Sequence, residues 1–155
     1  MRHAAKLLLL VIASATFALA GQKPQSPQFI PVEVPGATAT FVYGINNAGA
    51  VVGYYTGTSS SGFVYQNGVF TPLNVPGSGG TVPTAINNLG QVVGYYSDAS
   101  GTHGFKYSNG TFTTIDYPGA QNTYLWGIND NGDISGATVG PQSGEASSGQ
   151  GVEIR

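Results

Sequence analysis

The sequence predicts an all-β protein built from tandem four-stranded antiparallel repeats of about 41 residues, β-propeller-like blades that form an incomplete propeller. Three observations lead to this prediction: segments that recur at a fixed offset, turn-forming residues at the same place in each repeat, and a composition that favours strands. Beyond residue 20, Val outnumbers Leu by 13 to 3, and glycine and proline supply 33 of 135 residues. A helical domain would instead be rich in Leu, Ala, Glu and Lys.

The recurring segments indicate the architecture. Residues 44–55 read GINNAGAVVGYY and residues 85–96 read AINNLGQVVGYY, an offset of 41, while residues 127–136 read GINDNGDISG. The intervening segments 62–77 and 104–119 also match one another. The alternatives are a β-solenoid, whose coils are usually shorter, and a single β-sandwich, which has no reason to repeat its sequence.

The pattern divides the chain into a signal peptide (1–20), a flexible lead-in (21–28), a β-repeat domain of about three units (29–136), and a degenerate or flexible C-terminal segment (137–155). The signal peptide is predicted because two positive charges precede an apolar run, and small residues then stand before a cut at Gly21. We therefore expect an exported protein that is secreted, periplasmic or at the cell surface.

Each unit reads as four short strands, which in the first unit are residues 41–45, 51–55, 63–65 and 69–75. Asn-rich turns join the first strand to the second. The third and fourth strands meet through Asn67-Gly68, and Asn109-Gly110 repeats this pair in the next unit. Asn-Gly is a strong hairpin signal because a type I′ turn needs positive φ at both central residues.

The repeated pattern GIN-x-x-G-x-VVG, followed by (H)-G-F-x-Y-x-NG-x-F, resembles the bacterial extracellular repeats of the HAF family over about residues 29–136. The family is named for a His-Ala-Phe tripeptide, and His103-Gly104-Phe105 stands in its place here, with Ser61-Gly62-Phe63 in the first unit. The resemblance implies a secreted or surface protein of bacterial type and brings no catalytic residues. Relatives often end in a hydrophobic helix with a basic tail. Residues 140–155 contain neither, so anchoring by that route is not expected.

Composition excludes several classes of partner and site. Without residues 1–20 the chain has 3 basic and 7 acidic side chains, a net charge of −4, and no basic surface for nucleic acid. It contains no cysteine, which excludes disulfides, thiolate metal sites and a cysteine nucleophile. After the signal peptide, no apolar run is long enough to span a bilayer.

The polar residues suggest little catalytic chemistry. Asp116, Asp130 and Asp133 stand at strand ends or turns, where Asp commonly accepts hydrogen bonds from the backbone. Residues 129–133 lack the ligand spacing of a calcium loop. His103 has no second histidine or cysteine for a zinc site, and no Gly-x-Ser-x-Gly elbow accompanies it. We expect neither a metal nor a cofactor.

Two tyrosine pairs, Tyr54-Tyr55 and Tyr95-Tyr96, recur in the second strands of the first two units. Neighbouring side chains of a strand point to opposite faces, so we expect both to pack between repeats. The alternative is a platform for stacking sugars. That platform would be incomplete in the third unit, which has Ala137 and Thr138 at these positions.

The longer loops emerge at one end of the strands, and variable loops on a uniform scaffold are common binding sites. We predict a ligand-binding patch there, formed by Asp98, His103, Gln121, Asn122 and Tyr124. The predicted function is a non-enzymatic binding or structural module that recognises glycan or protein. The alternative is an extracellular carbohydrate-active hydrolase that uses carboxylates of the same loops.

The last prediction concerns closure of the repeat array. Residues 29–36 (FIPVEVPG) align with residues 70–77 (FTPLNVPG), so Phe29–Val34 is a fourth strand without its first three. The third unit, by contrast, lacks a fourth strand in its pattern. We expect Phe29–Val34 to pair with the C-terminal unit, in its own chain or in a partner. A homodimer of six repeats would then close the ring.

Overall fold

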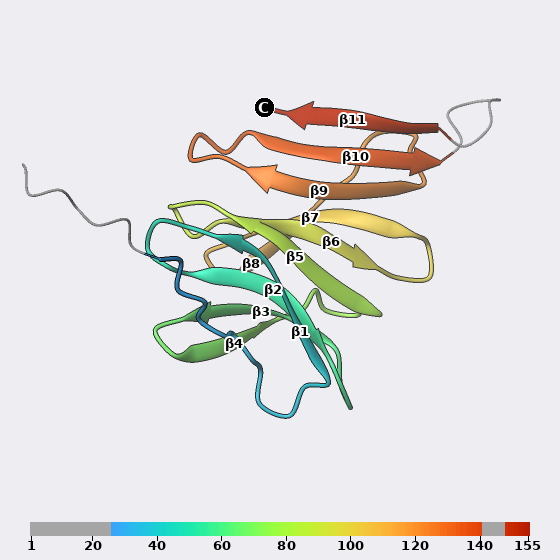
Figure 1. The fold of residues 1–155 in the computed structure, drawn as a ribbon. Coiled ribbons are helices and arrows are strands. Elements are labelled where there is room, and N and C mark those ends of the chain that lie inside the picture. The colour runs from blue at the N-terminus through green and yellow to red at the C-terminus, as the bar shows by residue number, and fades with distance from the viewer. Residues whose placement is uncertain (1–25, 141–147) are drawn as a thin grey trace, which may run out of the picture. The chain divides into compact units, whose positions relative to one another are not determined.

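The computed structural model describes residues 26–140 and 148–155 (Figure 1). The predicted signal peptide lies outside these residues, as do the first five positions of the lead-in. The chain from Pro31 onward forms one compact unit, and all the described strands belong to it. Every regular element of the described residues is a strand, so the prediction of an all-β fold is confirmed.

The eleven strands are β1 (Ala39–Ile45), β2 (Val51–Thr56), β3 (Ser61–Gln66), β4 (Val69–Leu73), β5 (Gly80–Ile86), β6 (Val92–Ser97), β7 (Thr102–Ser108), β8 (Thr111–Ile115), β9 (Asn122–Ile128), β10 (Ile134–Gly140) and β11 (Ser148–Ile154). They follow the sequence repeat. We call β1–β4 unit 1, β5–β8 unit 2 and β9–β11 unit 3.

Within each unit, consecutive strands pair antiparallel (Figure 1). Unit 1 is a four-stranded sheet in the order β1-β2-β3-β4. Units 2 and 3 share a seven-stranded sheet, in the order β11-β10-β9-β7-β6-β5, with β8 paired to β7. The two halves of that sheet meet through one parallel residue pair, Thr102 with Asn122.

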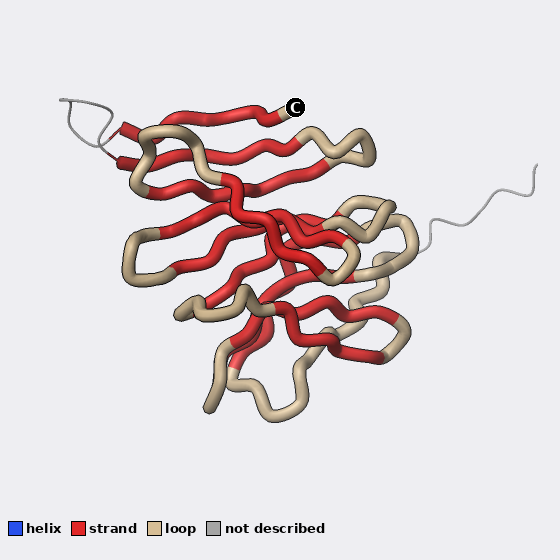
Figure 2. The backbone as a smooth tube through the Cα atoms, turned by 180° about the vertical axis from the view of Figure 1, so that it is seen from behind, coloured by secondary structure: helices blue, strands red, loops and turns tan. Residues whose placement is uncertain are grey.

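Local chemistry explains the hairpins. Asn67 and Asn109 have φ angles of 52° and 51°, and the glycine after each also has a positive φ, as a type I′ turn requires. Both Asn-Gly hairpins are thus confirmed. Figure 2 shows these strands and turns from behind, where short loops connect most neighbours.

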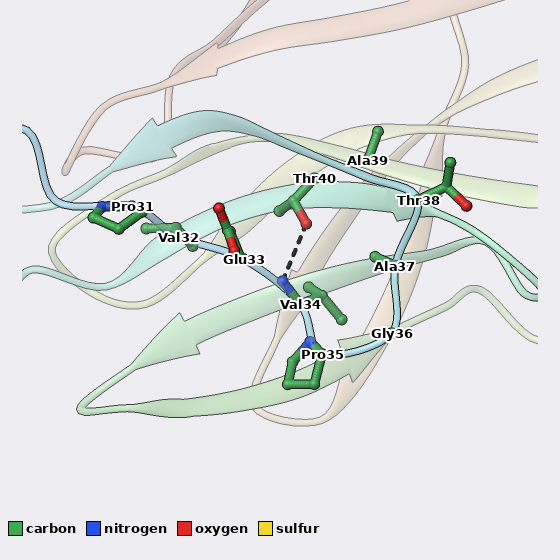
Figure 3. Close-up of a pocket in the computed structure, with 10 residues that line it drawn as sticks. All are labelled: Pro31, Val32, Glu33, Val34, Pro35, Gly36, Ala37, Thr38, Ala39 and Thr40. Atoms are coloured by element: carbon green, nitrogen blue, oxygen red, sulfur yellow. Dashed lines mark hydrogen bonds between the residues drawn. The ribbon is translucent and has the colours of Figure 1, made fainter.

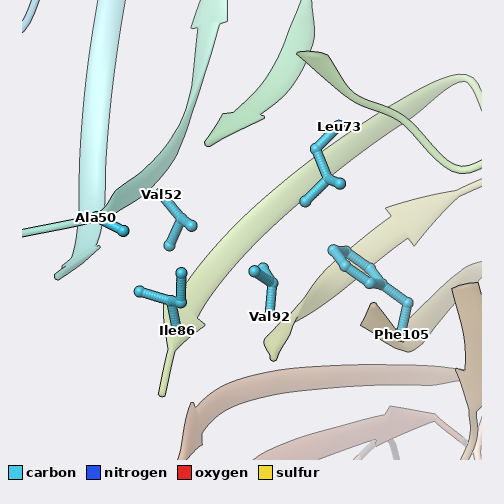
Figure 4. Close-up of a cluster of buried hydrophobic side chains, with 6 residues drawn as sticks. All are labelled: Ala50, Val52, Leu73, Ile86, Val92 and Phe105. Carbon is cyan, nitrogen blue, oxygen red and sulfur yellow. The ribbon is translucent and has the colours of Figure 1, made fainter. Parts of the chain in front are cut away.

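Apolar side chains pack between successive units. One buried cluster joins unit 1 to unit 2 (Figure 4); its members are Ala50, Val52, Leu73, Ile86, Val92 and Phe105. A second joins units 2 and 3 through Val93, Leu125 and Ile134. Removing this apolar surface from water contributes about 25 cal/mol per Å², so stacking of the units forms the core.

A glycine in each third strand allows the next unit to approach closely. A Cβ on Gly62 would lie 2.7 Å from Cδ of Pro83, and a Cβ on Gly104 would lie 2.8 Å from Cγ of Leu125. Both distances are too short for two carbon atoms. Each glycine is therefore a socket for one side chain from the first strand of the following unit.

The Asn-rich turns stack as well. Nδ2 of Asn46 donates to the carbonyl of Asn87 at 3.1 Å, and Nδ2 of Asn87 donates to the carbonyl of Asn129 at 2.9 Å. Beside them, the backbone N–H of Asn47 donates to Oδ1 of Asn88, and the backbone N–H of Asn88 donates to Oδ1 of Asp130. We call this series the asparagine ladder. Its donors all point from one unit to the next.

The structure departs from the predicted elements in two places. Residues 31–34 form no strand, so the expected pairing of this segment with unit 3 of the same chain is absent. In the segment expected to be degenerate or flexible, β10 continues to Gly140 and β11 pairs with it over seven residues. The sequence pattern fades there because glycine and serine replace large side chains, although the backbone pairing continues.

Candidate functional site

The predicted binding residues fall into two neighbourhoods. Asp98 and His103 come together beside the β6–β7 loop, and Oδ1 of Asn122 accepts a hydrogen bond from the Thr102 amide next to them. The carbonyl of Gln121 also lies against this loop, at Gly101. Tyr124 belongs to a separate group of aromatic rings.

His103 is held between two carboxylates. Its Nδ1 lies 2.8 Å from Oδ2 of Asp116, and its Nε2 lies 3.3 Å from Oδ1 of Asp98 and 2.9 Å from Oγ of Ser100. Asp116 reaches the histidine because β8 pairs with β7, and the Tyr96 ring packs on the imidazole at 5.2 Å. We call these four polar residues the histidine clamp.

The electrostatics of the clamp favour a charged histidine. The hydrogen bond to Asp116 raises the pKa of His103 above its ordinary value, and the charges of Asp116 and Asp98 act in the same direction. Hydrogen bonds from the hydroxyl and amide of Ser100 lower the pKa of Asp98 to about 2. The clamp therefore favours the protonated imidazole over the neutral one more than bulk water does.

The atom order Ser100–His103–Asp116 is that of a hydrolase triad, which the sequence did not predict. One feature opposes that chemistry. The Ser100 hydroxyl and backbone amide both donate to Asp98, at 2.6 and 2.7 Å, so the hydroxyl proton is directed to a carboxylate and not to the imidazole. The clamp fits a role in fixing the β6–β7 loop.

The aromatic group begins in unit 3. Tyr124 and Trp126 stack with ring centroids 5.9 Å apart and an interplanar angle of 6°. Tyr95 of unit 2 meets both rings edge-on, at 5.0 and 5.6 Å. Half of the Trp126 surface remains exposed to solvent.

Unit 1 adds three more rings. Tyr54 stacks on Phe41 at 4.9 Å and lies nearly parallel to Tyr43 at 6.2 Å. Burial raises the pKa of Tyr95, and the charges of Tyr43, Tyr124 and Tyr54 raise it further. We call the six residues the aromatic cluster: Phe41, Tyr43, Tyr54, Tyr95, Tyr124 and Trp126.

β-Bulges present two of these rings. The first strand of each unit has a register shift against the second, and the extra residue is Tyr43 in unit 1 and Trp126 in unit 3. A bulge re-aims a side chain out of the regular alternation, and bulges are frequent next to binding sites. Both side chains are about half exposed, at 51% and 50%. In unit 2 the equivalent residue is the buried Thr84, which bonds to two carbonyls.

The sequence prediction identified only part of this cluster. Tyr95 and Tyr54 were expected mainly as packing residues, and the platform was expected to be incomplete in unit 3 because of Ala137 and Thr138. Ala137 and Thr138 leave these positions of β10 without rings, and the aromatic rings of unit 3 come from β9. The available signal was the recurrence of aromatic residues at alternate positions of the first strands.

The described residues contain no group of three or more His, Asp or Glu side chains arranged to hold a metal ion. Asn129 and Asp133, which resemble calcium ligands in sequence, bond to each other at the turn. The described part of the chain also has no helix with the length and apolar character needed to cross a membrane.

Comparison of the chain with models of protein families, with curated proteins and with solved structures finds no match. The function must therefore be inferred from the residues and their geometry.

Proposed function

We propose that this is an exported, non-enzymatic binding module and that its aromatic cluster binds a glycan. The observation that carries the proposal is the half-exposed Trp126, stacked on Tyr124 and supported edge-on by Tyr95. The C–H groups of a pyranose ring have a positive edge that suits the negative face of an aromatic ring. Tyrosine hydroxyls at the rim supply hydrogen bonds to sugar hydroxyls.

Charge supports this ligand class over nucleic acid, which also stacks on aromatic rings. The chain has 5 basic and 7 acidic side chains, so little positive charge is available to neutralise phosphates. A neutral glycan requires no such charge. The six rings span three units, which suits an extended chain of sugars rather than a single residue.

The proposal includes the finer architecture. We interpret the three units as β-propeller-like blades, because each consists of antiparallel neighbours in sequence order and packs its core against the next. The resemblance to HAF-type repeats and the predicted signal peptide support export to the periplasm, the medium or the cell surface.

A fluorescence titration tests the proposal directly, because Trp126 is the only tryptophan of the chain. Soluble cellohexaose and chitohexaose, added separately, are expected to shift or quench its emission with saturation. Absence of any change with these and with a wider panel of neutral oligosaccharides would contradict the proposal.

Variants locate the site. Trp126→Ala and Tyr124→Ala should each weaken binding, by about 2 kcal/mol or roughly thirtyfold in Kd for the tryptophan, as measured by calorimetry. Tyr117→Ala is the matched control, because Tyr117 is an exposed aromatic residue outside the cluster. The same samples are assayed for released sugar. Turnover that depends on Asp98 or Asp116 would instead support the alternative, a carbohydrate hydrolase.

A further inference from the structure

Each unit of the stack has a glycine socket that can accept a side chain from the first strand of the next unit. Pro83 of unit 2 fills the socket at Gly62 of unit 1, and Leu125 of unit 3 fills the socket at Gly104 of unit 2. By register, the socket of unit 3 is Gly151, because it pairs with Ala137 as Gly104 pairs with Tyr95. A Cβ on Gly151 would meet no atom of the described residues within 4 Å, so residues 26–140 and 148–155 leave this socket empty.

The side chain that matches this socket stands at the other end of the stack. Val42 occupies the position of Pro83 and Leu125 in β1, with the same register shift beside it. Leu125 is 0% exposed, whereas Val42 is 47% exposed. Unit 1 thus presents the residue that fills a socket, and unit 3 presents a socket.

A second pair of apolar features follows the same rule. Ile86 packs into the core between units 1 and 2 and is 8% exposed, whereas its equivalent in unit 1, Ile45, is 68% exposed. Unit 3 has an open hollow of about 460 Å³ beside the Asn-rich turn, lined in part by Ile128 and Ile134. Ile45 of a following unit would cover that hollow, as Ile86 covers the corresponding surface of unit 1.

The asparagine ladder has free positions at the same two ends. Each unit donates hydrogen bonds to the next, and no described residue accepts the amide of Asp130. In unit 3, Nδ2 of Asn129 bonds to Asp133 of its own turn instead of to another unit. In unit 1, the Asn46 carbonyl and Oδ1 of Asn47 are equivalent to the groups of unit 2 that accept hydrogen bonds from the preceding unit. Donors at one end therefore match acceptors at the other.

The N-terminal residues 29–32 are equivalent in sequence to the fourth strand of a unit, which unit 3 lacks among the described residues. Residues 29–32 align with the β4 residues 70–73, and the Val34 amide donates to Thr40 Oγ1 as the Val75 amide donates to Thr81 Oγ1. Figure 3 shows the stretch from Pro31 to Thr40 curving around a hollow beside the first strands. At the other end of the stack, β11 is an edge strand of its sheet.

We propose that a second copy of this chain occupies these ends, with unit 1 of each copy stacked on unit 3 of the other. Val42 fills the Gly151 socket, Asn129 and Asp130 continue the ladder onto the partner's turn, and residues 29–32 pair antiparallel with β11 as its fourth strand. Two such contacts, related by a two-fold axis, close a ring of six units. This proposal is independent of the glycan site.

A contact between copies fits the structure better than closure within one chain, because no described residue fills the Gly151 socket and Val42 is 47% exposed. Ordinary propellers have four to eight blades, so three units fall short of a ring and six do not. Pairing β11 also removes an exposed sheet edge, which would otherwise template aggregation.

Cysteine pairing tests the contact. The chain has no native cysteine, so Val42→Cys in one protein sample and Gly151→Cys in another introduce one thiol each. In the filled socket, Cγ of Leu125 lies 2.8 Å from the ideal Cβ of Gly104, which keeps the two β-carbons within about 4.3 Å and in range of a disulfide. Mild oxidation of the mixed samples should give a covalent heterodimer in high yield.

The controls separate this contact from random oxidation. Val69→Cys replaces Val42→Cys in a parallel mixture, because Val69 is 61% exposed and lies on β4, away from the proposed contact. Equal dimer yield from both mixtures would overturn the proposal.

Light scattering of the uncrosslinked protein tests closure. The expected mass is twice that of one chain, and Val42→Asp should reduce it to one chain while the far-UV circular dichroism stays unchanged. Val69→Asp should leave the dimer intact. A monomer at all concentrations overturns the proposal, and an open polymer overturns the closed ring, since a head-to-tail contact that fails to close forms filaments.

Discussion

The middle unit and the two end units use the same positions in opposite ways. Ile86 of unit 2 is 8% exposed, while Ile45 of unit 1, which is also followed by two asparagines, is 68% exposed. Gly104 receives a side chain of the following unit, whereas Gly151 receives none. The burial of a side chain in this protein therefore depends on the stack. The same position is buried where another unit packs against it and exposed where none does.

The largest expected effect comes from emptying a filled socket. Leu125→Ala should destabilise the protein by about 2–5 kcal/mol, because Leu125 is fully buried and its removal leaves a cavity between units 2 and 3. Val42→Ala, at the equivalent position of unit 1, should cost less than about 1 kcal/mol at a concentration low enough for monomers. Denaturant unfolding of both variants measures the difference.

Similar losses from the two variants would show that the units do not stack as described. If the Leu125 variant alone is destabilised, the free end of unit 1 is confirmed as a surface.

A smaller effect is expected from the asparagine ladder. Asn87 is 4% exposed, and its side chain bonds to the Leu89 and Gln91 amides, to Gln91 Oε1 and to the Asn129 carbonyl. Asn87→Ala leaves these groups without partners and should cost about 1–3 kcal/mol. Asn129→Ala should cost less, because its side chain is exposed and bonds only to Asp133 among the described residues.

Thermal unfolding of these two variants gives the comparison. A cost at Asn129 equal to that at Asn87 would mean that the turn itself, rather than bonding between units, requires the asparagine.

The parts of the fold that the sequence predicted are those that depend on near neighbours or on the repeat. Asn67-Gly68 specifies its hairpin by φ angles alone, and a 41-residue period implies equivalent units. The aromatic cluster could not be predicted in the same way. Its rings come from three units, and the bulges at Tyr43 and Trp126 shift their direction away from simple alternation.

The partners of His103 in the histidine clamp could not be predicted from the sequence either, although they lie within one unit. His103 and Asp116 are 13 residues apart and meet only through the register of β7 with β8. Position 103 was identified from its loop, but its carboxylate partners follow from strand pairing. Predicting them required the register, which the Asn109-Gly110 turn fixes.

The smallest expected effect is a pH dependence confined to the middle unit. His103 stands where unit 1 has Ser61 and unit 3 has Gln150, so at this position a histidine occurs in unit 2 and in neither of the other two units. Because Asp116 raises the pKa of His103 in the folded state, the folded protein binds this proton more tightly than the unfolded chain does. The resulting stabilisation is fully present below the unfolded pKa of about 6.5 and is lost as pH rises through the raised folded value.

Asp98 gives the opposite slope in acid. Its pKa is lowered to about 2, so its contribution is present above the unfolded value of about 4 and is lost as pH falls toward 2. Melting temperatures between pH 3 and pH 9 should therefore be highest between these two losses. His103→Gln should flatten the decline on the alkaline side and leave the Trp126 fluorescence unchanged. A decline that persists in this variant would assign the pH dependence to another group and leave the clamp without a measurable role in holding the β6–β7 loop.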